Sequence, residues 1–455
     1  MGWYGVRWWY DLAHVCQRWR NLILRSPSFL DICLLCTWGT PVADMLAHSP
    51  PLPLVIDLFD YFNKKRDITS DEEKGIFLAL EKRDRVRRIR LWMPQAARSI
   101  QKFVMAINEE YPVLEYLIVT PSMEDEGALE LPETFRSPHL RHLQLKGFTL
   151  PIGTQFLTTA ISIVTLNLST YHSSADFPPN TLLRWISSMP QLETLQINFS
   201  FPVPNHDMER QSMHTPITTR VTLPNLRWFG FRGVSAYMEA VVSRIAAPRL
   251  EKLTIGFFKQ LTFSLPCLLQ FMNTIEDFRF NRADFEFSNY GVHVKAYPEM
   301  AITDALSMDV RCLHLDWQVS SMAQIFTSLC EIFSTVEHLT VEHITFDPTH
   351  RPTFDPTLEY EVHSLSSEEH DDVDRIEWRK LLSSFSNVSS LRIDGRIAMQ
   401  LSRCLQPEDG ESPLEPMPKL EPGGLRYSGR TNNRDALTSF GDILEILKAR
   451  HRHKP

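Results

Sequence analysis

A short apolar phrase recurs along this chain of 455 residues, and it limits the folds that the chain can adopt. The phrase has an apolar residue, then two residues of any type, an apolar residue, one further residue and a last apolar residue. Its copies begin at Val86, Leu114, Leu140, Ile163, Leu192, Leu226, Leu250, Ile275, Val310, Val336 and Val388. Starts lie 23 to 35 residues apart, except for a final gap of 52. Spacing of this kind is typical of a protein built from stacked repeats.

Segments before many of these phrases have apolar residues three and four positions apart, which predicts amphipathic helices. They span 99–112, 181–190, 237–248, 322–334 and 376–386. Proline ends three of them, because it cannot donate the next helical hydrogen bond. Each repeat is therefore a helix, a turn and a strand, and stacked parallel copies bury one continuous core. We predict an α/β fold, an irregular leucine-rich-repeat solenoid; an ordinary pair of α/β domains is the alternative.

Alternation along each strand predicts a row of side chains that points away from the core. Tryptophan and arginine are prominent in this row, and both are frequent energetic anchors of protein interfaces. A merely solvated face is the alternative for any single member. The candidate target-binding residues of this concave face are Arg90, Trp92, His142, Lys146, Trp228, Arg232, Arg279, His314, His338 and Arg392.

Charge and hydropathy exclude some partners. The formal net charge is -8, whereas nucleic-acid binders usually carry a basic surface. The arginines between positions 83 and 90 are interpreted as a solvated strand entry. The sequence has no apolar run of about eighteen residues, the length that a membrane span needs. We therefore expect neither a nucleic-acid nor a membrane partner.

Motifs for catalysis are absent from the sequence. It has no phosphate-binding glycine loop, no nucleophile elbow and no H-E-x-x-H zinc motif. His314 and Asp316 could form an acid–base pair on one strand, but we favour a non-catalytic role. The seven cysteines are irregularly spaced, and we interpret Cys33 and Cys36 as buried structural residues. The chain is expected to be a non-enzyme without cofactor or metal, in the cytoplasm, the nucleus or both.

The opening residues predict a short helix. Its apolar residues are spaced three or one positions apart, so they would lie along one side of a helix, and Asp11 is a plausible N-terminal cap. Pro27 ends the segment, and a second apolar stretch follows. Such a small helical lobe needs to pack on something else to be stable.

These residues resemble the second half of an F-box, as found in the F-box proteins of mushroom-forming fungi. The resemblance lies in Cys16-x-x-Trp19-Arg20, in Ser26-Pro27 and in the apolar run with Asp31 that follows. Residues 37–58 also resemble the segment that joins an F-box to leucine-rich repeats. A full F-box begins with a Leu-Pro-x-Glu helix that has no counterpart before Leu12. The resemblance therefore indicates an N-terminally shortened box.

The resemblance implies a substrate receptor of a cullin–RING (SCF-type) ubiquitin ligase. The box would bind a Skp-family adaptor, which links to the cullin scaffold, and the repeats would bind an unknown target protein. A repeat scaffold without adaptor binding is the alternative. The residues that would form the box core and the adaptor contacts are Leu12, Val15, Cys16, Trp19, Leu22, Ile23, Pro27, Phe29 and Leu30.

Three parts are expected along the chain. Residues 1–36 would form a partial F-box-like helical segment, and residues 37–80 would form a connecting segment. Residues 81–455 would form the leucine-rich-repeat-like solenoid. An acidic insertion is expected near 345–375, where the sequence reads SSEEHDDVD at 366–374.

Overall fold

The computed structural model divides the chain into two compact units, residues 1–201 and 202–455, which are described separately. It describes residues 15–18, 21, 33–59, 68–92, 97–121, 129–150, 155–170, 177–200, 220–258, 260, 262–276, 278–312, 314–344, 375–405, 417–428 and 434–452.

The first unit contains a parallel sheet in the order β1-β2-β3-β4-β6-β8-β9. Its strands are β1 (Leu34–Thr37), β2 (Leu54–Phe59), β3 (Val86–Trp92), β4 (Tyr116–Thr120), β6 (His142–Lys146), β8 (Thr165–Thr170) and β9 (Thr194–Phe199). The helices between them are α3 (Val42–His48), α4 (Ser70–Leu80), α5 (Ala97–Ala106), α6 (Gln155–Thr159) and α7 (Pro179–Ser187). A small separate pair joins β5 (Leu129–Glu130) to β7 (Phe148–Thr149).

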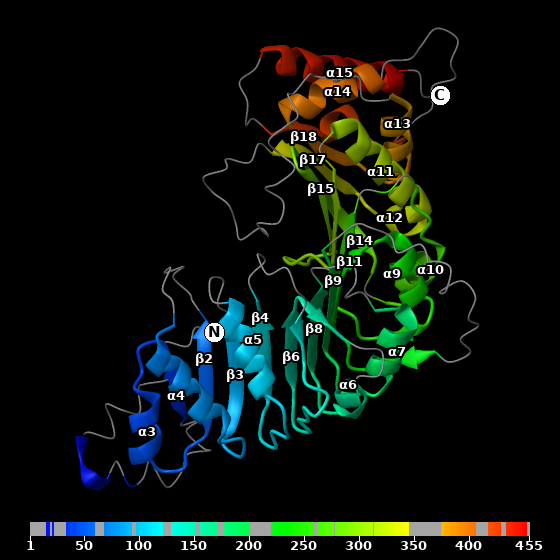
Figure 1. Ribbon diagram of the computed structural model, residues 1–455. Helices are drawn as coiled ribbons and strands as arrows, with labels where there is room; N and C mark the ends of the chain where they lie inside the picture. Colours follow the sequence, from blue (N-terminus) through cyan, green and yellow to red (C-terminus); the bar gives the residue numbers. More distant parts are fainter. Residues whose placement is uncertain are drawn as a thin grey trace. The chain divides into compact units, whose positions relative to one another are not determined.

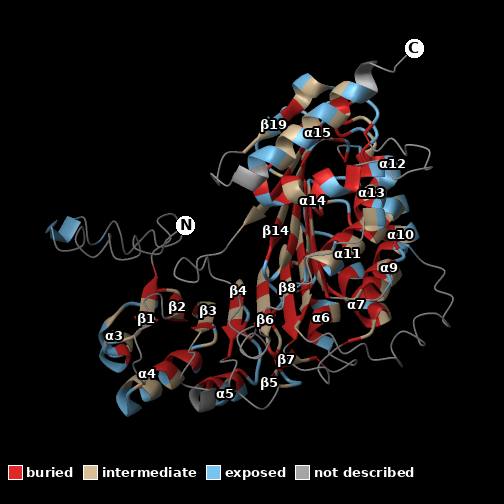
Figure 2. Ribbon diagram, turned by 90° about the horizontal axis from the view of Figure 1, so that it is seen from above, coloured by how far each residue is buried: buried red, intermediate tan, exposed pale blue. Residues whose placement is uncertain are grey.

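Strand alternation produces the core of this unit. Ile89, Leu117, Leu143, Leu166 and Leu195 are register partners on successive strands, and each is fully buried. The residues between them are partly exposed. In Figure 2 the buried residues follow the strands, and exposed residues gather on the helices. The apolar side chains of each strand are thus buried, and the polar side chains point away from the core.

Successive turns are tied together by hydrogen bonds. The amide of Glu115 donates to the carbonyl of Arg87 at 2.8 Å, and that of Glu193 donates to Val164 at 2.9 Å. The buried hydroxyl of Tyr111 donates to the carbonyl of Leu80 at 3.0 Å. These bonds satisfy backbone groups that would otherwise be buried without partners, which fixes the spacing of the repeats.

The second unit has a mixed sheet in the order β11-β13-β16-β15-β14-β17-β18-β19. Its strands are β11 (Trp228–Gly233), β13 (Lys252–Phe258), β14 (Phe280–Ser288), β15 (Gly291–Pro298), β16 (Leu306–Arg311), β17 (His338–Ile344), β18 (Ser390–Ile393) and β19 (Leu425–Tyr427). A separate pair joins β10 (Val221–Thr222) and β12 (Ile245–Ala246).

Helices alternate with these strands, and in Figure 1 α9 to α13 lie along one side of the unit. They are α9 (Ser235–Val242), α10 (Pro266–Asn273), α11 (Leu315–Ser328), α12 (Cys330–Phe333), α13 (Arg375–Ser383), α14 (Gly395–Leu405), the 3₁₀ turn η5 (Pro422–Gly424) and α15 (Arg434–Arg452). The predicted α/β class, with strands and helices alternating in a mostly parallel sheet, is confirmed. This arrangement is consistent with a leucine-rich-repeat-like solenoid.

The expectation of parallel strands throughout is wrong at one place. β15 pairs antiparallel with both β14 and β16, so a hairpin interrupts the parallel order. Its turn carries Gly291, where a Cβ would lie 2.4 Å from the carbonyl oxygen of Val310. A side chain at this position would displace β16, which explains why the turn needs glycine.

Two of the recurring phrases do not mark the strands as predicted. The phrase at Ile275 ends where β14 begins, and the phrase at Val310 spans the end of β16 and the start of α11. Register shows that Ala283 and Leu306 occupy the core positions that the phrase predicts. In the repeat that contains β16, polar Thr303 stands at the first position of the phrase, so the apolar pattern could not be recognised there.

The sheet begins before residue 81. β1 and β2 pair in parallel with each other, and β2 pairs with β3, inside and just before the segment expected to be a connector. The acidic insertion and most of the opening segment lie outside the described residues. No helix in the described part of the chain has both the length and the apolar character needed to cross a membrane.

Cys33 and Cys36 are buried at β1, as their structural interpretation requires. Burial raises the pKa of the Cys36 thiol to about 12, with Cys33 adding to the rise and Arg85 opposing it. The thiol therefore stays protonated at neutral pH, which makes it a poor nucleophile and a poor metal ligand.

Truncation of the aromatic core should destabilise the second unit. Phe285 is buried, with ring centroids 5.1 Å from Phe326 and 5.6 Å from Phe385. We expect Phe285→Ala to lower the free energy of unfolding by about 3 to 5 kcal/mol because it leaves a cavity. Urea unfolding followed by circular dichroism measures this. Ile302→Ala, at a side chain 96% exposed, is the control and should change little; equal effects would contradict the packing.

Thiol reactivity tests the environment of Cys36. Iodoacetamide at mildly alkaline pH should modify exposed Cys330 quickly and Cys36 very slowly, since alkylation needs an accessible thiolate. Peptide mass spectrometry of timed samples gives both rates. The two rates should converge in denaturant. Equal rates in the native chain would show that Cys36 is not buried.

Candidate functional site

The first unit presents a face of partly exposed side chains from alternate strand positions. In register, Arg88 lies next to Tyr116, Tyr116 next to His142, and His142 next to Thr165. We call this surface the first open face. Its partly exposed members are Phe59, Arg88, Arg90, Trp92, Tyr116, His142, Gln144, Lys146, Thr165, Asn167, Gln196 and Asn198; Asp57 and Ser169 are buried on the same side and form hydrogen bonds with Arg90 and Asn198.

One end of the first open face combines arginine with aromatic rings. Arg90 donates to both carboxylate oxygens of Asp57, at 2.9 and 2.6 Å, so its guanidinium is fixed in a two-bond geometry. The same guanidinium lies 4.6 Å from the ring centre of Phe59, which packs 4.5 Å from Trp92. The ion pair and the rings hold each other in one orientation. This gives a preorganised aromatic patch.

A second stack crosses β3, β4 and β6. The guanidinium of Arg88 lies 4.7 Å from the ring centre of Tyr116, which stacks on His142 at 4.1 Å with an angle of 13°. His142 Nδ1 lies 3.1 Å from the hydroxyl of Thr165. Burial, helped by Arg141 and Arg88, lowers the pKa of His142. The imidazole is therefore neutral at physiological pH and acts as a flat stacking surface.

On β8 and β9 this face is neutral and rich in amides. The Asn167 amide donates to the Gln196 carbonyl oxygen at 2.6 Å, and Asn198 donates to Ser169 at 3.2 Å. Side-chain amides and hydroxyls form hydrogen bonds that adapt to a partner at modest desolvation cost. The first open face thus changes from aromatic and basic to neutral and polar along the sheet.

The second unit has an open face of different character. Trp228 on β11 is 37% exposed, and its Nε1 donates to Thr254 at 3.3 Å. Arg232 reaches Asp309 at 3.5 Å across β13. A Cβ on Gly256 would lie 3.0 Å from both Arg232 and Asp309, so the missing side chain makes room for this pair. We call this surface the second open face; it includes Trp228, Arg232, Thr254, Asp284, Glu286, Lys295, Asp309, Thr340, Glu342, Arg392 and Arg426, and ion pairs link its neighbouring strands.

Most of the predicted face residues lie on strands. Arg90 and Trp92 are on β3, His142 and Lys146 on β6, Trp228 and Arg232 on β11, His338 on β17 and Arg392 on β18. Arg90, Trp92, His142 and Lys146 belong to the first unit, and Trp228, Arg232, His338 and Arg392 belong to the second. Lys146 is the register partner of Ser169 at the polar end of the first open face.

Two predicted face residues are placed elsewhere. Arg279 precedes β14, and His314 is the N-terminal cap residue of α11, with Asp316 in the first turn of that helix. The misplaced phrases at Ile275 and Val310 caused both errors. His314 packs against Trp317, with the ring centres 5.2 Å apart, and neither His314 nor Asp316 lies on a strand, so the disfavoured strand pair does not form. The acid–base arrangement that the sequence suggested is therefore not present.

Several functional candidates were missed. Asp57 and Phe59 lie on β2, which the sequence interpretation placed in a connecting segment. Arg282, His293 and Lys295 lie on the hairpin, whose signal is the turn before Gly291 followed by alternating Val292, Val294 and Ala296. Burial and nearby Lys295 lower the pKa of His293.

The predicted adaptor-binding residues lie mostly outside the described residues. These are Leu12, Trp19, Leu22, Ile23, Pro27, Phe29 and Leu30. Val15 is 65% exposed and Cys16 is also exposed.

No protein-family model matches this chain, and no curated protein matches it. Within the described part of the chain, no group of three or more histidine, cysteine or acidic side chains is arranged to hold a metal ion. The described arrangement is suited to binding through rings, guanidiniums and amides.

The lowered pKa of His142 predicts a pH dependence of stability. Protonation is disfavoured in the folded state, so below about pH 6.5 the unfolded chain binds more protons and stability falls. We expect His142→Gln to reduce the loss of unfolding free energy between about pH 7.5 and about pH 5. Urea titrations at both pH values measure it.

His139→Gln is the matched control for that experiment, because His139 is exposed in a turn beside the same strand. It should leave the difference between the two pH values unchanged. The same difference for wild type and His142→Gln would show that His142 is not desolvated.

Proposed function

We propose that this chain is the substrate receptor of a cullin–RING (SCF-type) ubiquitin ligase, with an irregular leucine-rich-repeat solenoid that binds a target protein. The two open faces are the observation that carries the proposal. They present Trp92, Trp228 and Tyr116 together with guanidiniums on rigid strands. Such side chains are enriched at the energetic centres of protein interfaces.

Rigid presentation supports a binding role. The Arg90–Asp57 pair and the stacked rings fix rotamers before any partner arrives. Ordering these side chains therefore costs little entropy on association. A receptor of this kind performs no chemistry itself. It raises the effective concentration of a target beside a ubiquitin-conjugating enzyme.

The adaptor half of the proposal is supported by the resemblance of residues 12–36 to an F-box. There Trp19 and its neighbours would bind a Skp-family adaptor, which joins the cullin scaffold. Val15 and Cys16 have exposed side chains, as residues do before a partner covers them. A scaffold that binds proteins through its sheet faces without an adaptor remains the second candidate, because the open faces support it equally.

Direct binding to the purified Skp-family adaptor distinguishes the two candidates. We expect the full chain to bind the immobilised adaptor in biolayer interferometry, and Trp19→Ala to weaken binding at least about tenfold, as loss of a buried aromatic anchor does. Trp317→Ala is the matched control: Trp317 is 44% exposed and lies in the second unit. It should bind as wild type does.

Equal circular dichroism spectra for the three proteins would show that the substitutions leave the fold intact. Failure of the wild-type chain to bind would contradict the ligase assignment and leave the scaffold function. Equal weakening by both substitutions would show that Trp19 is not a specific adaptor contact.

A further inference from the structure

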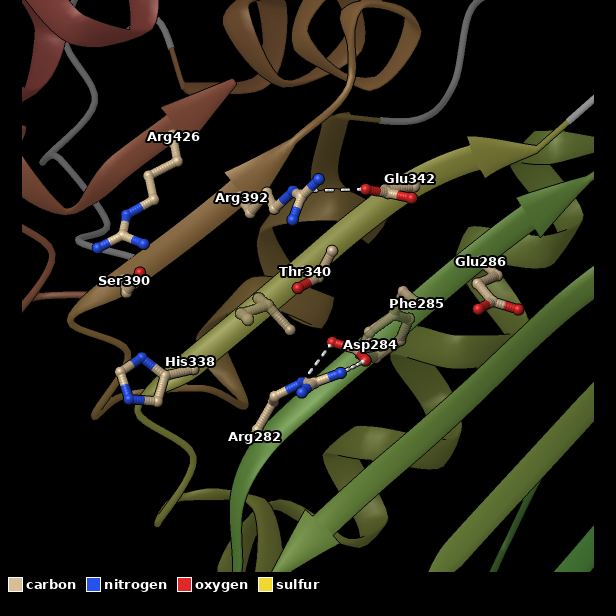
Figure 3. Close-up of a pocket in the computed structure, with 11 residues that line it drawn as sticks. Arg282, Asp284, Phe285, Glu286, His338, Thr340, Glu342, Ser390, Arg392 and Arg426 are labelled. Atoms are coloured by element: carbon tan, nitrogen blue, oxygen red, sulfur yellow. Dashed lines mark hydrogen bonds and ion pairs between the residues drawn. The ribbon is translucent and has the colours of Figure 1, made fainter. Parts of the chain in front are cut away.

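A pocket of about 420 Å³ opens on the second open face, over β14, β17, β18 and β19 (Figure 3). Basic and hydroxyl side chains that line it include Arg282, His338, Thr340, Ser390, Arg392 and Arg426. Acidic residues also line it, so the distribution of charge decides what it can bind.

The acidic residues already have partners. Asp284 accepts two hydrogen bonds from Arg282, and Glu286 pairs with Lys295 at 2.9 Å. Glu342 accepts a hydrogen bond from the Ser428 hydroxyl at 2.9 Å and lies 3.6 Å from Arg392. Each of these carboxylates therefore has a hydrogen-bond or ion-pair partner within the protein.

The basic residues are less well compensated. Arg392 and Arg426 are register partners on β18 and β19, and their guanidiniums point to different neighbours, Arg392 toward Glu342 and Arg426 toward Ser390 (Figure 3). Arg392 shares Glu342, but Arg426 is exposed and has no carboxylate within ion-pair distance in the part of the chain that the structure describes.

Hydroxyl donors accompany these arginines. Ser390 is the register partner of His338, and Thr340 is the register partner of Arg392. Within the described residues, the side chains of His338, Thr340 and Ser390 have no hydrogen-bond partner, and Figure 3 shows them on the pocket wall with both arginines. Donors without partners near the guanidinium of Arg426, which has no carboxylate partner among the described residues, suit an anionic oxygen group.

We propose that this pocket binds an acidic side chain, a carboxylate or a phosphate monoester, on a peptide segment of the partner protein. This inference rests on the proposed role of the open faces in protein binding. The guanidiniums of Arg392 and Arg426 hold the anion, and Ser390 and Thr340 donate hydrogen bonds to it. A planar guanidinium matches both carboxylate and phosphate in a two-bond geometry.

A peptide fits the pocket better than a nucleic acid. Asp284, Glu286 and Glu342 border the basic residues, so a chain of closely spaced phosphates would meet carboxylates on the same face. A single acidic side chain on an otherwise neutral peptide avoids this repulsion.

Fluorescence anisotropy with the full chain tests the proposal. The probes are peptide pools with mixed flanking residues and a fixed central serine, phosphoserine, glutamate or lysine. We expect the phosphoserine or glutamate pool to bind more tightly than the serine and lysine pools. Arg426→Gln should weaken that binding at least about fivefold, because it removes a charge-assisted contact at an exposed position.

Arg403→Gln is the matched control. Arg403 is exposed on α14, and the substitution changes net charge by the same amount. It should leave peptide affinity unchanged, and melting temperatures should agree for all three proteins. No preference for acidic centres, or equal loss in both variants, would overturn the proposal. Tighter binding of a single-stranded oligonucleotide that Arg426→Gln abolishes would overturn the choice of a peptide.

The comparison of phosphoserine with glutamate identifies which anion the pocket prefers. Adaptor binding is scored on the same protein preparation. If the adaptor binds but acidic peptides show no advantage, this inference alone fails. If acidic peptides bind and the adaptor does not, the ligase assignment is wrong, and the proposal that the pocket binds an acidic side chain still holds.

Discussion

The two-residue alternation of the strands is the constraint on which the rest of this structure depends. In the first unit, Leu117 and Leu143 are register partners in the core, while the neighbouring Tyr116 and His142 are partners on the open face. A slip of one residue would exchange these rows and expose the apolar one to water. Burial of the apolar row therefore fixes the register, and the register fixes which polar side chains meet.

The fold could be predicted where one apolar row alternated with polar residues. β3, β6 and β9 follow that pattern, and β9 follows the predicted helix α7. β2 could not be recognised in this way, because Leu54–Leu58 is buried on both faces and lacks alternation. β16 was misplaced because polar Thr303 stands where the phrase begins. The hairpin of β14 and β15 has a local turn signal, but its place in the sheet required long-range information, because β16 pairs with β13 and the hairpin lies between β16 and β17.

The sequence could predict which side chains lie on the open faces, but it could not predict which side chains contact each other there. Alternation placed Arg90, Trp228 and Arg392 on open faces. The partner of Arg90, however, is Asp57, 33 residues earlier, and Glu342 meets Ser428, 86 residues later. Such contacts depend on which strands become neighbours. No local pattern reports that choice, so neither the preorganised rings nor the basic pocket was visible in the sequence.

The central claim is that each strand buries one row of side chains in the core and leaves the other row of side chains accessible to a partner. Hydroxyl-radical footprinting of the isolated chain tests it without any substitution. Trp228 is 37% exposed, whereas adjacent Phe229 and the helix residues Trp185 and Trp378 are fully buried. After correction for intrinsic reactivity, Trp228 should be oxidised at least about ten times faster than these three, since oxidation follows solvent access. Protection of Trp228 equal to that of Trp185 would contradict the account, because the face could then not receive a partner.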